Sequence, residues 1–297
     1  MATLVNTVPE PRAALQDEPK LPWKQILWFG GLLAICYAPV LYRLVQQWIS
    51  DEDMGHGFFV PLISGYIIWQ RRAELSTLKL ESSPWGLLLI LWGACQLMLG
   101  TLGAELFLAR TSFLVSLLGV ILYLGGTKLV RALAFPLILL LFMIPIPAIV
   151  YSRITLPLQL FASSVAETLL GWMNIPVLRD GNVLELASQK LSVVEACSGI
   201  RSLLSLSFLS LIYGYFFDSK VWMRWALLAG TIPIAIAANA ARVTLTGVLS
   251  EIRKEFAQGF FHTAEGWVLF LVALALLLLL HQAINGVYRF YHAKQVA

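Results

Sequence analysis

The sequence predicts an all-α integral membrane protein of about eight transmembrane helices, with a small outer-face hairpin or loop insertion before the sixth. Of its 297 residues, 59% are hydrophobic and 13% are charged, whereas soluble domains carry about 25% charged residues. Apolar runs close to the roughly 20 residues that cross a bilayer recur along the chain. The expected spans are Ile26–Val45, Gly57–Trp69, Trp85–Thr101, Leu106–Leu124, Ala132–Val150, Ser198–Phe217, Trp225–Leu249 and Ala264–Ile284.

Two segments decide the number of transmembrane spans. Gly57–Trp69 is short for a span, so we expect it to borrow Asp53–His56 or to lie partly inside the protein. Ile154–Trp172 carries several polar residues among its leucines, which favours a helix lying on or dipping into the membrane. A ninth span there would invert the orientation of everything that follows.

The distribution of charge supports eight spans with both termini in the cytoplasm. On that arrangement every inner segment carries lysine or arginine, while the first outer loop reads Asp51-Glu52-Asp53. We expect one membrane domain over residues 23–290, between a disordered cytoplasmic tail at 1–22 and a short cytoplasmic tail at 291–297. The sequence has no nucleotide-binding glycine motif and no paired Cys-x-x-Cys. We therefore expect membrane lipid around the chain, with no nucleic-acid partner, metal or cofactor.

A short β element is expected between Asn174 and Glu195, before the sixth span. Asp180-Gly181 is a turn signal, and Asn182–Leu186 and Lys190–Val194 are rich in valine and leucine and are expected to pair as a hairpin. Unpaired strand edges are forbidden in lipid, so this element should sit above the membrane or against protein.

One of the three cysteines stands apart. Cys36 and Cys95 fall in the middle of expected spans, where cysteine serves as a small hydrophobe. Cys197 follows the longest polar stretch and comes just before the sixth span, and a helix N-terminus favours a thiolate. Arg201, one turn on, would add to that effect. The alternative is an unreactive cysteine in a capping region.

Two further polar residues fall on the same expected side of the membrane. Arg242 interrupts an apolar span, so it must face the protein interior or water and have an anionic partner. A salt bridge with Glu251 or Glu265, or snorkelling to the surface, is the alternative. His262 stands at the outer entrance to the last span.

A thiol, an imidazole and a fixed cation are the parts that an acyl-transfer site needs. We therefore expect Cys197, Arg242 and His262 to converge in one outward-facing cavity that also opens laterally to the bilayer.

At these residues the chain resembles the exosortase/archaeosortase family of membrane cysteine transpeptidases. The resemblance rests on residues 194–202 (Val-Glu-Ala-Cys-Ser-Gly-Ile-Arg-Ser), on Asn239-Ala-Ala-Arg242-Val, on His262 with Glu265-Gly266, and on Met54-Gly-His56-Gly. It implies that Cys197 is the nucleophile, Arg242 the oxyanion or substrate-carboxylate partner, and His262 the base. The archaeal branch commonly has arginine in place of His262, which favours the bacterial exosortase type.

The resemblance also implies a substrate and a location. Exosortases are thought to act on secreted proteins with a C-terminal sorting signal, made of a Pro-Glu-Pro motif, a hydrophobic transmembrane anchor and a basic tail. Cleavage would pass through an acyl-enzyme, in bacteria that make exopolysaccharide. The chain would then lie in the bacterial inner membrane, with its active site facing the periplasm.

Four residues are further candidates for substrate binding: His56, Arg201, Asn239 and Glu265. Each also has a structural alternative. His56 would be a helix-entry residue, Arg201 would pair with Glu195, and Asn239 would hydrogen-bond between helices, which we favour. His281 and His292 are not expected to join an aspartate–histidine constellation.

Two rival functions remain open from the sequence. A transporter or flippase-like permease for a polysaccharide precursor would use Arg242 and the Pro145/Pro147 break as a substrate path. A non-catalytic secretion assembly factor would make Cys197 incidental.

Overall fold

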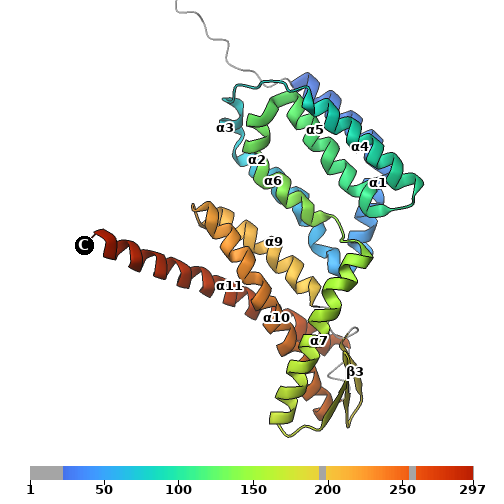
Figure 1. The fold of residues 1–297 in the computed structure, drawn as a ribbon, viewed down its shortest axis with the longest axis vertical. Coiled ribbons are helices and arrows are strands. Elements are labelled where there is room, and N and C mark those ends of the chain that lie inside the picture. The colour runs from blue at the N-terminus through green and yellow to red at the C-terminus, as the bar shows by residue number, and fades with distance from the viewer. Residues whose placement is uncertain (1–22, 194–198, 254–258, 297) are drawn as a thin grey trace, which may run out of the picture. The chain divides into compact units, whose positions relative to one another are not determined.

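The computed structural model describes residues 23–193, 199–253 and 259–296 (Figure 1). These described residues include seven helices that are long and apolar enough to cross a membrane, which confirms the all-α integral membrane class. The seven helices are Lys24–Ser50, Trp85–Leu102, Leu106–Ala132, Ala148–Trp172, Ile200–Phe217, Val221–Ile252 and Ala264–Tyr291. The expected N-terminal tail at 1–22 lies outside the described residues, and the C-terminal helix continues through the expected tail to Val296.

The chain forms two compact units. One contains the residues up to Tyr42 together with Leu62–Leu140, and the other contains Arg43–Pro61 and the residues from Leu141 onward. The first unit draws on α1 (Trp23–Ser50), α2 (Phe59–Gln70), α3 (Arg72–Ser76), α4 (Trp85–Leu102), α5 (Leu106–Ala132) and α6 (Ala134–Leu139). The second draws on the end of α1, on the 3₁₀ helix η1 (Glu52–Phe58) and on the chain from Leu141.

In the first unit, α4 and α5 pack backbone to backbone. Gly86, Gly93 and Gly100 recur every seven residues along α4 and are all buried. A Cβ at Gly86 would lie 2.4 Å from the backbone nitrogen of Tyr123, and one at Gly100 would lie 2.6 Å from that of Ala109. Any larger residue would force the two helices apart, so the glycines define this contact.

One expectation about the middle of the chain is wrong, and a second segment differs in length from what was expected. The expected span Ala132–Val150 is not one helix, because α6 runs into a 3₁₀ turn at Leu140–Met143 and the chain breaks at Pro145 and Pro147. A new helix, α7 (Ala148–Trp172), starts directly after Pro147. Its 25 residues make it about 37 Å long, so the stretch expected to lie on the membrane belongs to a helix long enough to cross it.

The polar residues of α7 that suggested a helix lying on the membrane face a β-sheet. The Asn182 side chain donates to Gln159 Oε1 at 3.0 Å, and Ser163 Oγ donates to the carbonyl of Gly181, also at 3.0 Å. These polar side chains therefore form hydrogen bonds with backbone and side-chain groups of the sheet instead of facing lipid headgroups.

The sheet itself has three antiparallel strands in the order β1 (Val177–Asp180), β2 (Val183–Leu186) and β3 (Lys190–Ser192). The expected hairpin is confirmed, with Leu184 opposite Leu191. The strand β1 was not expected. The Asp180-Gly181 turn joins it to β2, and Gly181 has the positive φ of 63° that glycine adopts without strain.

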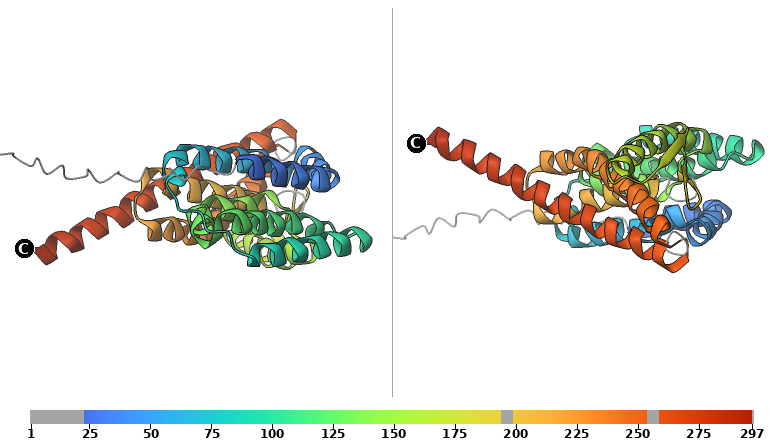
Figure 2. Two further views of the ribbon diagram at one scale, coloured as in Figure 1. Left: turned by 90° about the horizontal axis from the view of Figure 1, so that it is seen from above. Right: turned by 90° about the horizontal axis from the view of Figure 1, so that it is seen from below.

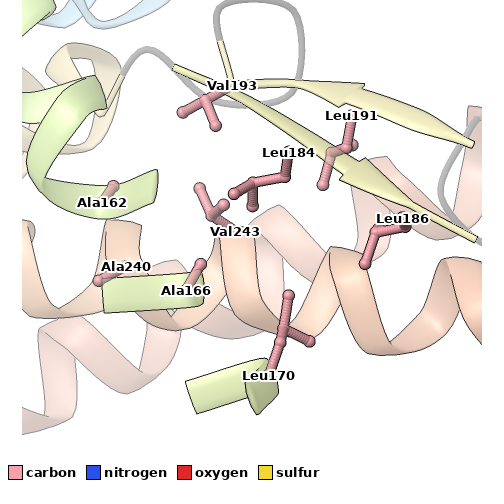
Figure 3. Close-up of a cluster of buried hydrophobic side chains, with 9 residues drawn as sticks. All are labelled: Ala162, Ala166, Leu170, Leu184, Leu186, Leu191, Val193, Ala240 and Val243. Atoms are coloured by element: carbon pink, nitrogen blue, oxygen red, sulfur yellow. The ribbon is translucent and has the colours of Figure 1, made fainter. Parts of the chain in front are cut away.

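The sheet packs on α7 and on the last third of α10. Figure 3 shows side chains from the three elements meeting in one apolar cluster. Its members are Ala162, Ala166, Leu170, Leu184, Leu186, Leu191, Val193, Ala240 and Val243. The segment that precedes Cys197 is thereby held against the helix that carries Arg242.

Three helices complete the second unit: α9 (Ile200–Phe217), α10 (Val221–Ile252) and α11 (Gly259–Val296). They share a second apolar cluster of Leu206, Met223, Leu227, Ala273 and Leu277. The C-terminal turns of α11 extend past α9 and α10 (Figure 2), which agrees with the exposed side chains of Phe290 and Tyr291.

Candidate active site

The entry to α9 is built on a glycine. Cys197 lies outside the described residues, but Gly199, two residues later, is the N-cap of α9 and has a φ of +70°. A Cβ at this position would lie 2.9 Å from the Cγ and Nδ2 atoms of Asn239. Both the conformation and the close contact require glycine. Helix α9 therefore begins directly against Asn239 of α10.

Asn239 is buried, with 5% of its surface exposed. It lies at the α9–α10 contact, as a bridge between helices would. Its Oδ1 atom is buried and accepts no hydrogen bond within the described part of the chain. An orphaned buried amide costs about 1–3 kcal/mol, so a group of this kind is typical of a binding site.

One turn further along α10, Arg242 reaches α11. A Cβ at Gly266 would lie 3.0 Å from Nη2 of Arg242 and 3.1 Å from its Cζ, so the guanidinium lies on the bare backbone of α11. His262 belongs to the same helix, one turn before Gly266. Residues four apart share a helix face, so position 262 lies on the side of α11 that Arg242 approaches. The His262 side chain lies outside what the structure describes, and the expected convergence with Cys197 stays a prediction.

Glu265 ties the same two helices together. It is 7% exposed, and its two carboxylate oxygens lie 2.9 and 3.0 Å from the Thr246 hydroxyl. The other acid considered as an arginine partner, Glu251, instead accepts a hydrogen bond from the backbone N–H of Ser188 at 3.0 Å. Glu251 therefore fixes the β2–β3 turn to the end of α10.

Arg201 pairs with an acid far away in the sequence. Its Nε donates to Oδ1 of Asp53 at 2.8 Å, and Oδ2 of Asp53 accepts from the Tyr151 hydroxyl at 2.8 Å. One carboxylate thus joins η1, α7 and α9. The alternative partner of Arg201, Glu195, lies outside the described residues. Asp53 and Arg201 are 148 positions apart in the sequence, so no local pattern signals this pair.

His56 lies in η1 with its ring 6.1 Å from that of Phe208. Burial lowers the pKa of His56, against the opposing effects of the carbonyls of Phe142 and Asp53 and of the Asp53 charge. Both ring nitrogens are buried, and neither makes a hydrogen bond of ordinary geometry within the described residues. His56 is therefore kept neutral in an aromatic setting beside α9.

The expectation that His281 does not join an aspartate–histidine constellation is wrong. His281 Nε2 lies 3.0 Å from Oδ2 of Asp218, and Nδ1 lies 2.9 Å from the Tyr213 hydroxyl. Asn285 donates to the same Asp218 oxygen at 3.1 Å, and the backbone N–H of Lys220 donates to Oδ1 at 2.8 Å. Burial would raise the pKa of Asp218, but the hydrogen bonds from His281, Lys220 and Asn285 prevail and lower it to about 2.

This Asp218 network joins α9, α10 and α11 near the start of α10. About 30 Å of helical rise separates it from Arg242, so it is not part of the same site. Sequence reasoning missed the hydrogen bonds of Asp53 and Asp218, because each of these acids contacts residues distant in the chain.

No group of three His, Cys, Asp or Glu side chains among the described residues could hold a metal ion.

The comparison with known families agrees with the motifs from which this site was built. Residues 48–279 match the family described as transmembrane exosortase (Exosortase_EpsH), a stretch that spans η1, the sheet and the Arg242 region. No curated protein and no solved structure matches the chain. Since the match covers well over half of the sequence, the chain belongs to the transmembrane exosortase family.

Proposed function

We propose that this protein is a membrane-embedded cysteine transpeptidase that cleaves the C-terminal sorting signals of secreted proteins. Its substrates would carry a Pro-Glu-Pro type motif followed by a transmembrane anchor, and the reaction would take place on the periplasmic face of the inner membrane. One observation supports this most directly. Two polar residues one turn apart on α10, Asn239 and Arg242, lie against Gly199 at the start of α9 and against Gly266 of α11, and Cys197 and His262 precede these glycines in the sequence by two and four residues.

The proposed chemistry assigns one role to each residue. The Cys197 thiolate attacks the scissile carbonyl carbon, and the negative charge that develops on the carbonyl oxygen is stabilised by Arg242. His262 takes the thiol proton and returns it to the amine as the C–N bond breaks. The acyl-enzyme is a thioester, which an amine or water then attacks, with His262 accepting that nucleophile's proton.

Arginine suits the proposed oxyanion role for a physical reason. Its charge does not titrate in an apolar setting, and its planar fork presents several donors in fixed directions. Gly266 leaves the guanidinium in contact with α11, so the α10 and α11 contributions to the site would move together.

The test is processing of a co-expressed sorting-signal protein, followed by mass determination of its new C-terminus. We expect Cys197→Ala to abolish processing, and Cys36→Ala and Cys95→Ala to leave it unchanged, because these two exposed cysteines lie in α1 and α4. Hydroxylamine added to the native enzyme with its substrate should release a hydroxamate of the cleaved chain, because it attacks thioesters. A membrane-impermeant maleimide should label Cys197 from the outside. Full processing by Cys197→Ala would overturn the proposal and leave the transporter and assembly-factor functions as the leading ones.

A further inference from the structure

The strand β3 has one unpaired edge. It is the last strand of the sheet, and within the described residues only β2 pairs with it. Leu186 N–H donates to Gln189 and Val193 N–H donates to Asn182, so residues 189, 191 and 193 direct their backbone groups at β2. In an antiparallel ladder these groups alternate in direction. The N–H and C=O groups of Lys190 and Ser192 therefore point to the free edge.

The larger side chains at β3 already have partners. Leu191 and Val193 are buried in the cluster with α7 and α10, and the Lys190 ammonium pairs with Glu185 of the neighbouring strand. What the strand still offers is the hydrogen-bonding capacity of its backbone. Backbone donors and acceptors near a membrane need partners, because lipid supplies none.

The opposite edge of the sheet differs. There β1 follows directly on α7, and Arg179 of β1 pairs with Glu167 of that helix at 2.8 Å. The edge of β3 instead leads along the chain to the proposed nucleophile. Cys197 is five residues beyond Ser192, which puts it within about 17 Å even for a fully extended chain.

We infer that the free edge of β3, at Lys190 and Ser192, binds the substrate as an added β-strand. The ligand is an extended peptide segment next to the scissile bond, recognised through its backbone and held beside the reacting thiol. Addition of a strand to an exposed sheet edge is a general mode of peptide recognition, in which main-chain hydrogen bonds supply affinity. This inference rests on the proposed function, because it requires that the substrate be a polypeptide.

A strand bound in this way has a periodic signature. Only alternate residues of an added strand direct their N–H groups at the sheet, while the residues between point away. Methylation of single backbone nitrogens in a synthetic sorting-signal peptide should therefore raise KM about tenfold at every second position near the cleavage site. The same change at the intervening positions should have little effect.

The protein offers a matched set of variants. Ser192→Pro removes one edge-facing N–H without removing a bond to β2, and we expect it to raise KM about tenfold with little change in kcat. Val177→Pro is the matched control: it makes the corresponding change on the far edge, where residues 177 and 179 point outward, and should leave KM unchanged.

The outcomes separate this inference from the proposed function. Cleavage of the parent peptide with equal tolerance of N-methylation at every position would overturn strand addition and leave the transpeptidase intact. No cleavage of any peptide by the native enzyme would instead count against the proposed function. Monodisperse elution and an unchanged melting temperature in detergent are required of each variant. If Ser192→Pro fails this control, the alternating pattern in the methylated peptides decides the question alone.

Discussion

Helix α10 carries polar residues in two places, and the two places differ in how their hydrogen bonds are completed. At its start, Asp218 accepts from His281, Asn285 and the Lys220 backbone, and the Tyr213 hydroxyl pairs with His281. About 30 Å along the helix, the Asn239 oxygen is buried with no donor among the described residues. Among the described residues, the Asp218 carboxylate has its hydrogen-bond partners, whereas the Asn239 oxygen does not.

This difference separates architecture from function. A buried polar network in which every member has a partner rigidifies the helices that supply it. A buried polar group without a protein partner costs about 1–3 kcal/mol, which a ligand, an ordered water or a catalytic role can offset. The Asp218 network thus fixes the rotation of α11, since His281 falls on the same helical face as Leu277, Ala273 and Gly266, at spacings of four, four and seven residues. Arg242 approaches α11 on that face.

The largest effect is expected at Arg242. Arg242→Lys should lower kcat/KM for the sorting-signal substrate by at least ~100-fold, since an ammonium has no planar fork and places its charge differently on Gly266. The melting temperature in detergent should change little. Activity within a few fold of wild type would show that the Asn239–Arg242 region of α10 is not an active site. The difference between this region and the Asp218 network would then have no functional meaning.

A smaller loss of activity is expected from one methyl group. In Gly266→Ala the added Cβ would meet the guanidinium at about 3.0 Å and displace it, and we expect a loss of about tenfold in kcat, because small misplacements at a reacting centre are costly. Gly286→Ala is the matched control on the same helix, since a Cβ there meets nothing within 4 Å. Kinetics of both variants in proteoliposomes would be compared, and equal activities would contradict the placement of Arg242.

The Asp218 network should affect stability and not chemistry. Its carboxylate has a pKa of about 2 in the folded protein, below the usual value of 3.8, so ionisation stabilises the fold above about pH 4 by about 2 kcal/mol. That contribution is lost as the pH falls from about 4 to 2. Asp218→Asn should lower the melting temperature at pH 7 and remove this pH dependence, with kcat per folded molecule unchanged.

Asp180→Asn is the control for that experiment, because Asp180 is an exposed residue at the end of β1. Its melting curve should match the wild type at both pH 7 and pH 3. A large loss of kcat in Asp218→Asn would mean that the two ends of α10 are coupled. The Asp218 network would then contribute to the reaction as well as to stability.

The sequence predicted the membrane class and the hairpin, because each leaves a local pattern of hydropathy or turn residues; the roles of Cys197, Arg242 and His262 stay predictions. It did not predict the contact of α7 with the sheet, because the polar stripe at Gln159 and Ser163 is the same whether it faces headgroups or a sheet. It missed Asp53 and Asp218 because their partners are 148 and 63 residues away. Long-range pairing of this kind depends on the fold and is not encoded in any short segment.

The glycine contact between α4 and α5 has a consequence for how the protein is made. The two helices are neighbours in sequence, separated only by Gly103, Ala104 and Glu105, so their interface needs no residue synthesised later. Helices in a membrane associate through such close van der Waals contact, and local contacts form early. The pair can therefore assemble in the bilayer as soon as α5 leaves the translocon, while the helices that carry Arg242 and His262 are still to be translated.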